Sequence, residues 1–226
     1  MNELLKMTAH QIKEGKFDKV ILAIGSCEAH GQHLAEGCDT IVSYELSKQV
    51  ADRVPGMLVL PPITVGYSGH YDTFPFTLTF DYETMIHVIY DIVESVLRNG
   101  INKIFLMNGH DGNIAPIEIA ARKIKEKYPD ARIASLPEWW VIAGKLVPEG
   151  TFKVWNGLGH AGEGESSIAY HLFPQWCEPD QATCVVPDHL PEHVDIKWDF
   201  AEITDTAQTG DATIATAEKG KLMNDC

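Results

Sequence analysis

The sequence has few basic residues: 18 lysines and arginines stand against 32 aspartates and glutamates, which gives a formal net charge of -14. A nucleic-acid groove needs a basic surface, so this deficit excludes a nucleic-acid partner and disfavours an anionic membrane surface. The sequence also lacks an apolar run long enough to span a bilayer, and residues 1–16 lack the apolar core of a signal peptide. We therefore expect a cytoplasmic protein with no membrane partner.

Cysteines are scarce, and their arrangement does not suggest pairing. There are five, an odd number, and no two form a CxxC pair. Free thiols in a reducing compartment fit this count better than a disulfide framework does. Cys27 and Cys38 adjoin acidic residues, beside which a thiolate is hard to maintain. We therefore predict that neither is a nucleophile or a metal ligand.

Segments typical of strands and helices alternate along the 226 residues, with no repeat or linker between them. This order predicts an α/β class: one layered domain over residues 1–226, with a mostly parallel sheet flanked by helices on both faces. Beyond residue 175 the pattern weakens, and we expect irregular structure with a short strand at 182–186. The main expected strands are 20–26, 57–62, 103–109 and 131–137, and the expected helices are 39–54, 81–100, 114–129 and 163–173.

A first polar cluster follows the expected strand 20–26 directly. Glu28 and His30 are two residues apart, so an extended backbone would point both side chains the same way. Carboxylate and imidazole ligands without thiolate favour zinc, manganese or iron. The alternative is an ordinary polar loop in which Asp39 only caps the next helix.

Two further polar strings lie at the ends of elements. Residues 108–113 follow the strand 103–109 and place His110 beside Gly109, where an unhindered backbone allows close approach to a metal. Because both strands are expected in one parallel sheet, their polar ends should lie on the same edge. Residues 159–167 contain His160, Glu163 and Glu165 before a helix. The alternatives are a simple turn at 108–113 and first-turn acidic residues that complement a helix dipole at 163 and 165.

The three strings together resemble those of the creatininase family, the creatinine amidohydrolases. The family pattern Gly-Ser-x-Glu-x-His-Gly-x-His with a following Asp is similar to residues 25–39. Its Asn-Gly-His-x-x-Asn is similar to residues 108–113, and its His-Ala-Gly-Glu-x-Glu-Thr-Ser to residues 160–167. Order and spacing agree across nearly the whole chain.

The resemblance implies a layered α/β fold and two divalent metal ions per chain. It also implies a homo-oligomer, since members of the family are often hexamers. We expect zinc in the first place, with manganese or iron as alternatives. The ligand roles that the resemblance implies are a bridging Asp39, His30 and His110 on one ion, and Glu28 on the other. It also implies a substrate-facing His160, and a place for Trp139 near an aromatic residue that lines the creatininase pocket.

This sequence departs from the family pattern at two places. Creatininase has a glutamate ligand two residues after the histidine of its second string, where this chain has Gly112. We expect Glu163, flanked by Gly162 and Gly164, to replace that ligand, with Glu165 as the alternative. Many relatives have Ser-x-Glu-His before Phe-Pro-Gly-Thr, which differs from residues 68–77, so we expect a substrate other than creatinine. The residues expected to bind this small molecule are Ser68, His70, Asp111 and Trp139.

The expected chemistry is hydrolysis of a C–N bond in a cyclic amide or a formamide. Two ions can hold a bridging hydroxide that attacks the carbonyl, and the same ions stabilise the resulting oxyanion. His160 would hydrogen-bond the carbonyl or transfer a proton, with Glu165 supporting the catalytic group. One alternative is a hydrolase that opens a cyclic diketone derived from inositol, and another is a family member that binds without catalysis.

Overall fold

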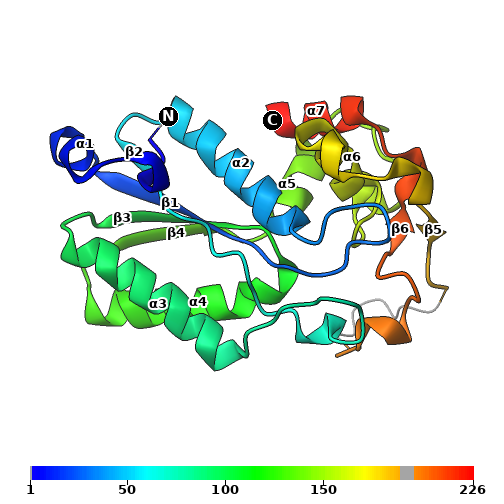
Figure 1. Cartoon of the computed structure of the whole chain (residues 1–226), viewed down its shortest axis with the longest axis horizontal. Coiled ribbons are helices and arrows are strands. Elements are labelled where there is room, and N and C mark those ends of the chain that lie inside the picture. The colour runs from blue at the N-terminus through cyan, green and yellow to red at the C-terminus, as the bar shows by residue number, and fades with distance from the viewer. Residues whose placement is uncertain (1, 189–195) are drawn as a thin grey trace. The chain divides into compact units, whose positions relative to one another are not determined.

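The computed structural model describes residues 2–188 and 196–226 (Figure 1). None of the helices within these residues is long and apolar enough to cross a membrane. The chain forms two compact units, each assembled from several segments. The first unit comprises Met1–Ser26, Asp39–Tyr67 and Thr79–Trp139, and the second comprises Cys27–Cys38, Ser68–Leu78 and Trp140–Cys226.

The first unit contains a four-stranded sheet in the order β2-β1-β3-β4. Every neighbouring pair is parallel. Five of the six residues of β1 are buried, as expected for a parallel strand that is covered on both faces. The α/β class predicted from the sequence is therefore confirmed. The strands are β1 (Lys19–Ile24), β2 (Met57–Val59), β3 (Lys103–Asn108) and β4 (Arg132–Leu136).

Helices cover both faces of this sheet. Figure 1 shows α3 and α4 side by side on one face and α2 on the other. Helix α3 begins after Asp81, whose carboxylate accepts a hydrogen bond from the backbone N–H of Thr84. Its buried stripe, which includes Met85 and Ile89, packs into the main core with β1 and β3. The helices of this unit are α1 (Ala9–Glu14), α2 (Cys38–Arg53), α3 (Tyr82–Arg98) and α4 (Ile114–Lys127).

The carboxyl ends of β1 and β3 lie in register, with Ile24 opposite Asn108. Gly109 donates its N–H to the carbonyl of Ile24 at 2.7 Å. A Cβ atom on Gly109 would lie 2.4 Å from the carbonyl oxygen of Asp39, so only glycine allows helix α2 to start this close to the strand ends. The strand register and Gly109 together bring Asp39 and His110 to one edge of the sheet.

The second unit is mainly helical. Helices α6 (Glu163–Leu172) and α7 (Ala217–Asp225) pack side by side, and the unit also contains most of α5 (Trp139–Leu146). A short antiparallel pair joins β5 (Cys184–Val185) to β6 (Gly210–Asp211). The strand expected at 182–186 is therefore present in a shorter form. Helices α5 and α7 were not expected from the sequence.

Candidate metal centre

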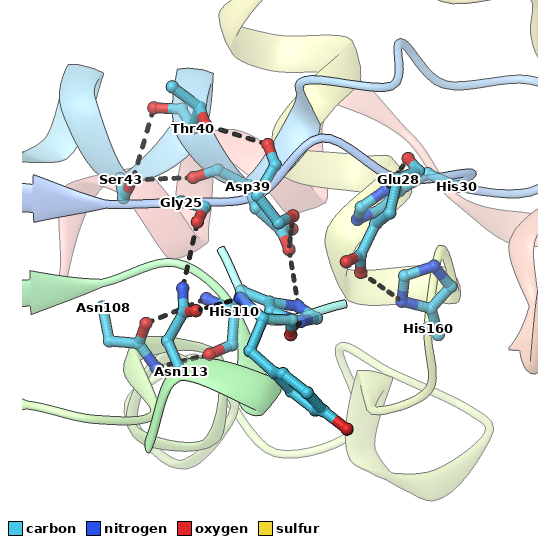
Figure 2. A network of polar contacts seen from close by, with 12 residues as sticks. Gly25, Glu28, His30, Asp39, Thr40, Ser43, Asn108, His110, Asn113 and His160 are labelled. Atoms are coloured by element: carbon cyan, nitrogen blue, oxygen red, sulfur yellow. Dashed lines mark hydrogen bonds and ion pairs between the residues drawn. The ribbon is translucent and has the colours of Figure 1, made fainter. Parts of the chain in front are cut away.

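In the first unit, Asp39 and His110 form a buried pair at the sheet edge. Oδ2 of Asp39 lies 3.1 Å from Nδ1 of His110, and both side chains are at most 5% exposed. Ser26 donates its hydroxyl to the same Oδ2 at 2.8 Å. Figure 2 shows the two side chains, one from the start of α2 and one from the turn after β3, pointing toward each other.

The backbone fixes which nitrogen of His110 carries a proton. Nε2 of His110 lies 2.8 Å from the carbonyl oxygen of Tyr67, and a carbonyl oxygen can only accept a hydrogen bond. Nε2 therefore carries the hydrogen, and a neutral ring presents the Nδ1 lone pair to the Asp39 carboxylate. Two acceptors 3.1 Å apart repel each other unless a proton or a metal cation neutralises the contact.

Two asparagines of the second string hold His110 in place. Asn108 accepts a hydrogen bond from the backbone N–H of His110 and donates one to its carbonyl oxygen, at 3.2 and 2.6 Å. Asn113 donates to the carbonyl of Gly25 and accepts from the N–H of Tyr67, both at 3.0 Å. No role for these asparagines was predicted from the sequence, because such contacts with distant backbone depend on the tertiary structure.

In the second unit, Glu28, His30 and His160 form what we call the Glu28 cluster. Each of these residues offers one ligand atom, and the three atoms lie within 4.8 Å of one another. Glu28 and His30 are fully buried. Oε1 of Glu28 lies 4.0 Å from Nδ1 of His160, and these two side chains face each other in Figure 2.

Backbone carbonyls also fix the tautomers of both histidines in this cluster. Nδ1 of His30 donates to the carbonyl of Glu28 at 3.0 Å, which leaves a lone pair on Nε2 of the neutral ring. Nε2 of His160 donates to the carbonyl of Ala29 at 2.7 Å, so its Nδ1 presents a lone pair toward Glu28. Metal-binding histidines characteristically donate their second nitrogen in this way. The donor set fits a divalent cation, because buried carboxylates need a positive charge and these imidazoles offer lone pairs.

The second histidine of the first string, His33, has a structural role. His33 is buried, and its Nε2 lies 2.7 Å from the hydroxyl of Ser166, which itself donates to the carbonyl of Ala161. Burial, together with a smaller effect of the neighbouring His30, lowers the pKa of His33 to about 4, so the ring is neutral at neutral pH. This hydrogen bond ties the first string to the segment that carries His160.

Glu163 has a different environment from the one predicted. Its Oε1 lies 2.5 Å from the ammonium nitrogen of Lys219, and its Oε2 accepts the backbone N–H of Lys153 at 2.8 Å. An ammonium group on the carboxylate competes directly with a cation. The ion pair joins the start of α6 to α7 and competes with the metal-ligand role expected for Glu163. Glu165 accepts the backbone N–H of Ala161 at 2.6 Å and so supports the turn that follows His160.

The expected substrate residues fall in both units. Ser68 is fully buried, and His70 packs on Tyr71 with ring centroids 4.3 Å apart. In the first unit, Asp111 is exposed at the start of a short 3₁₀ helix, and Trp139 is buried at the start of α5.

Two aromatic residues lie against His160, and neither was expected at the metal site from the sequence. The ring centroid of Tyr71 lies 4.6 Å from that of His160, and the centroid of Phe200 lies 5.2 Å from it. Phe200 falls in the irregular C-terminal region, where no local pattern marks it.

Cys27 does not have the properties of a nucleophile. Burial raises the pKa of its thiol, and the carboxylates of Glu36 and Glu28 raise it further. The thiol therefore stays protonated at neutral pH, in agreement with the expectation from the sequence.

Comparison with known proteins decides the family. The family model described as creatinine amidohydrolase matches residues 5–226. The chain belongs to the creatininase family. Members of this family are metal-dependent amidohydrolases, and this chain is an enzyme of that type. The resemblance seen in the three sequence strings is thereby confirmed.

Relatives with assigned activities match over most of the chain. A creatinine amidohydrolase of Pseudomonas putida is 29% identical over 219 residues, which cover 90% of this chain and 83% of the relative. A mycofactocin precursor peptide peptidase of Mycobacterium ulcerans is 25% identical, with 100% of this chain and 89% of the relative covered.

Solved creatininases share the fold. A manganese creatininase superimposes with a TM-score of 0.82 at 27% identity, covering 99% of this chain and 93% of the solved chain. A mutant creatininase of the Zn-Zn type gives a TM-score of 0.80 at 27% identity, covering 99% and 92%.

This chain has Gly112 where creatininase has a glutamate, and the structure gives a reason for the glycine. A Cβ atom at Gly112 would lie 2.2 Å from the carbonyl oxygen of Tyr67 and 2.6 Å from Nε2 of His110. These two atoms form the hydrogen bond that fixes the His110 tautomer. In this chain, a side chain at position 112 would break that hydrogen bond.

We predict that Gly112→Glu weakens metal binding by about 10-fold or more, because it displaces a group that orients a ligand histidine. Competition with a chromophoric chelator measures this affinity. Gly100→Ala is the control for general destabilisation, because the φ of +86° at Gly100 strains any residue with a Cβ although that Cβ would meet no atom within 4 Å. Tighter metal binding by Gly112→Glu would contradict the prediction.

We predict that Glu163→Gln keeps the metal content of the parent and loses about 1–3 kcal/mol of unfolding free energy, because a buried ion pair is lost. Elemental analysis and urea denaturation measure the two effects. The control is Lys221→Met, which removes an exposed ion pair between Lys221 and Asp225, both on α7. This change should lower the unfolding free energy far less. If Glu163→Gln bound one ion fewer than the parent, Glu163 would be a metal ligand and the prediction would be wrong.

Proposed function

We propose that this enzyme is a dinuclear metal-dependent hydrolase that cleaves the C–N bond of a cyclic amide or a formamide. Glu28, His30, Asp39 and His110 would hold the two ions, with Asp39 as the bridging carboxylate. The observation that carries this proposal is the orientation of the histidines. His30 and His110 each donate a hydrogen bond from one ring N–H to a backbone carbonyl. The other nitrogen of His110 presents its lone pair to the buried carboxylate of Asp39.

Divalent cations supply Lewis-acid chemistry: they polarise a carbonyl oxygen and lower the pKa of water toward neutrality. Zinc is our first expectation, with manganese or iron as alternatives, because the donor set is oxygen and imidazole nitrogen. Solved relatives named as manganese and Zn-Zn forms support the first two metals.

The residues around the proposed ligands fix their geometry. Ser26 holds Oδ2 of Asp39, and the carbonyl of Tyr67 holds the ring of His110, so both ligands are pre-organised before an ion binds. Tyr71 and Phe200 place flat apolar rings beside His160, which suits a planar amide group. Ser68, His70, Asp111 and Trp139 remain our candidates for binding the rest of the substrate.

An amide substrate is favoured over a ring ketone. The two relatives described above are named as an amidohydrolase and a peptidase. Both names denote enzymes that break an amide C–N bond. The inositol-derived diketone therefore stays the second candidate. We also expect a homo-oligomer, which light scattering on purified protein would establish.

A substrate panel tests the reaction class. Enzyme reconstituted with zinc or manganese would be assayed with creatinine, a formamidopyrimidine, small lactams, short peptides and an oxidised inositol. We expect turnover of at least one cyclic amide or formamide. Turnover of the diketone alone, or of peptides alone, would contradict the proposal.

We predict that Asp39→Ala loses both ions and lowers kcat by at least about 100-fold, because one carboxylate serves both ions. Elemental analysis and the assay above measure the two effects. The matched control is Asp52→Ala, an exposed acidic residue on the same helix, which should retain metal and activity. An Asp39→Ala variant with two ions per chain would refute the bridging role.

A further inference from the structure

We propose that a cavity between α1 and α3 binds a small amphipathic cation, that is, an apolar chain or ring that ends in an ammonium group. This α1–α3 cavity lies entirely in the first unit and has a volume of about 610 Å³. Small-molecule sites in proteins have volumes of about 300–1,000 Å³. Most of the residues that line the cavity are apolar, among them Ile12, Phe17, Val20, Leu58, Ile92 and Val96.

The cavity is separate from the metal-binding edge of the sheet. Val20, the second residue of β1, lines the cavity, whereas the polar strings begin after Ile24 and Asn108, at the opposite ends of β1 and β3. At about 3.3 Å per residue, Val20 lies about 13 Å from Ile24 along the strand. A ligand in the α1–α3 cavity would therefore bind away from Asp39 and His110.

The cavity leaves apolar surface that the fold covers only in part. Val20 and Leu58 are buried in the sheet. Ile12 and Phe17 on one side of the cavity, and Ile92 on the other, are only half-buried. Apolar surface in a hollow of this size is unfavourable in contact with water, and an apolar ligand would remove that contact. A concave hollow, unlike a flat face, suits a small molecule.

The N-terminal wall of the cavity is fixed by contacts with the rest of the unit. The backbone N–H of Val59 donates to the carbonyl of Asn2 at 2.8 Å. The buried carboxylate of Glu3 accepts a hydrogen bond from the hydroxyl of Tyr44 at 3.1 Å. These contacts hold Leu4 at the cavity. Because the wall is already in place, little conformational entropy is lost when a ligand binds.

The polar side chains of the cavity lie four residues apart at the end of α3, on one side of the helix: Asp91, Ser95 and Asn99. The hydroxyl of Ser95 donates to the carbonyl of Asp91 at 2.7 Å and accepts from Arg98 at 3.0 Å. The amide N–H of Asn99 donates to the carbonyl of Ser95 at 2.8 Å, so its amide oxygen is left as an acceptor. The groups left for a ligand are therefore acceptors.

The charge at the cavity favours a cation. Asp91 is exposed, and within residues 2–188 and 196–226 its carboxylate has no hydrogen bond or ion pair. The nearby guanidinium of Arg98 is paired with Glu94 at 3.4 Å. The carboxyl-terminal end of a helix also carries a partial negative charge, and α3 ends beside the cavity. An ammonium group has three donors and a positive charge, which match Asp91 and the amide oxygen of Asn99.

Three probes with the same apolar body test this inference: phenylbutylamine, phenylbutanol and phenylbutanoate. Titrations of the purified enzyme would be followed by methyl NMR. We expect the amine to shift the methyl resonances of Ile12 and Ile92. It should bind at least about 5-fold more tightly than the alcohol, as one partly exposed ion pair allows, and the carboxylate should bind most weakly.

Three variants separate the charge of the cavity from its shape. Asp91→Asn keeps the shape and removes the charge, so its affinity for the amine should fall to that for the alcohol. The matched control is Glu83→Gln, an exposed acidic residue at the other end of α3, which should bind the amine like the parent. Ile92→Trp should fill the cavity and abolish binding of both probes. Thermal denaturation checks that this variant folds, and if it does not, the Asp91→Asn comparison still tests the proposal.

The results that would overturn the proposal differ from one another. If millimolar amine shifts neither Ile12 nor Ile92, the cavity is not a ligand site. If the parent binds the amine and the alcohol equally, or if Asp91→Asn keeps the preference for the amine, the ligand is not a cation. If the parent does not bind the amine and Ile92→Trp dissociates an oligomer in sedimentation, the cavity is an interface between copies of the chain. None of these results bears on the proposed metal centre.

Discussion

The proposed chemistry depends on one interaction that occurs three times: a histidine donates a ring N–H to a backbone carbonyl. His30 donates to Glu28, His110 to Tyr67 and His160 to Ala29. Because a carbonyl oxygen cannot donate, each contact fixes both the tautomer and the orientation of the ring. The backbone thereby determines which nitrogen of each ring presents a lone pair, and the lone pairs of His110 and His160 are directed at buried carboxylates.

This interaction requires a backbone that brings carbonyl groups to defined positions. The parallel register of β1 and β3 aligns Ile24 with Asn108, and the small Gly109 allows α2 to begin beside them. Asn108 and Asn113 then hold His110 and the Tyr67 backbone. The same close packing excludes a side chain at Gly112, so the departure from the creatininase pattern and the anchoring of His110 have one physical cause.

Much of the first unit could be predicted from the sequence, because its signals are local. The apolar run of β1 and the 3.6-residue periodicity and Asp81 cap of α3 each specify an element within one segment. The dense polar strings also indicated Glu28, His30, Asp39 and His110, since polar residues that follow parallel strands gather at one edge. The family assignment rests on these strings, and the comparisons confirm it.

The environments of Glu163 and His160 could not be predicted, because their partners are distant in sequence. Lys219 lies 56 residues after Glu163, and Ala29 lies 131 residues before His160. The flanking glycines of Glu163 are compatible with a ligand, but the ammonium group that pairs with its carboxylate comes from α7, a helix not expected from the sequence. Long-range pairs of this kind depend on the completed packing, which no local pattern encodes.

The most direct test is the ¹⁵N NMR spectrum of the imidazole groups in the zinc-loaded enzyme, with the histidines assigned by substitution. It reports which ring nitrogen carries a proton and which binds a metal. We predict a proton on Nδ1 of His30 and on Nε2 of His110, with the opposite nitrogen of each ring bound to zinc. A proton on Nε2 of His30 or on Nδ1 of His110 would contradict the claim that backbone carbonyls select the metal-binding nitrogens.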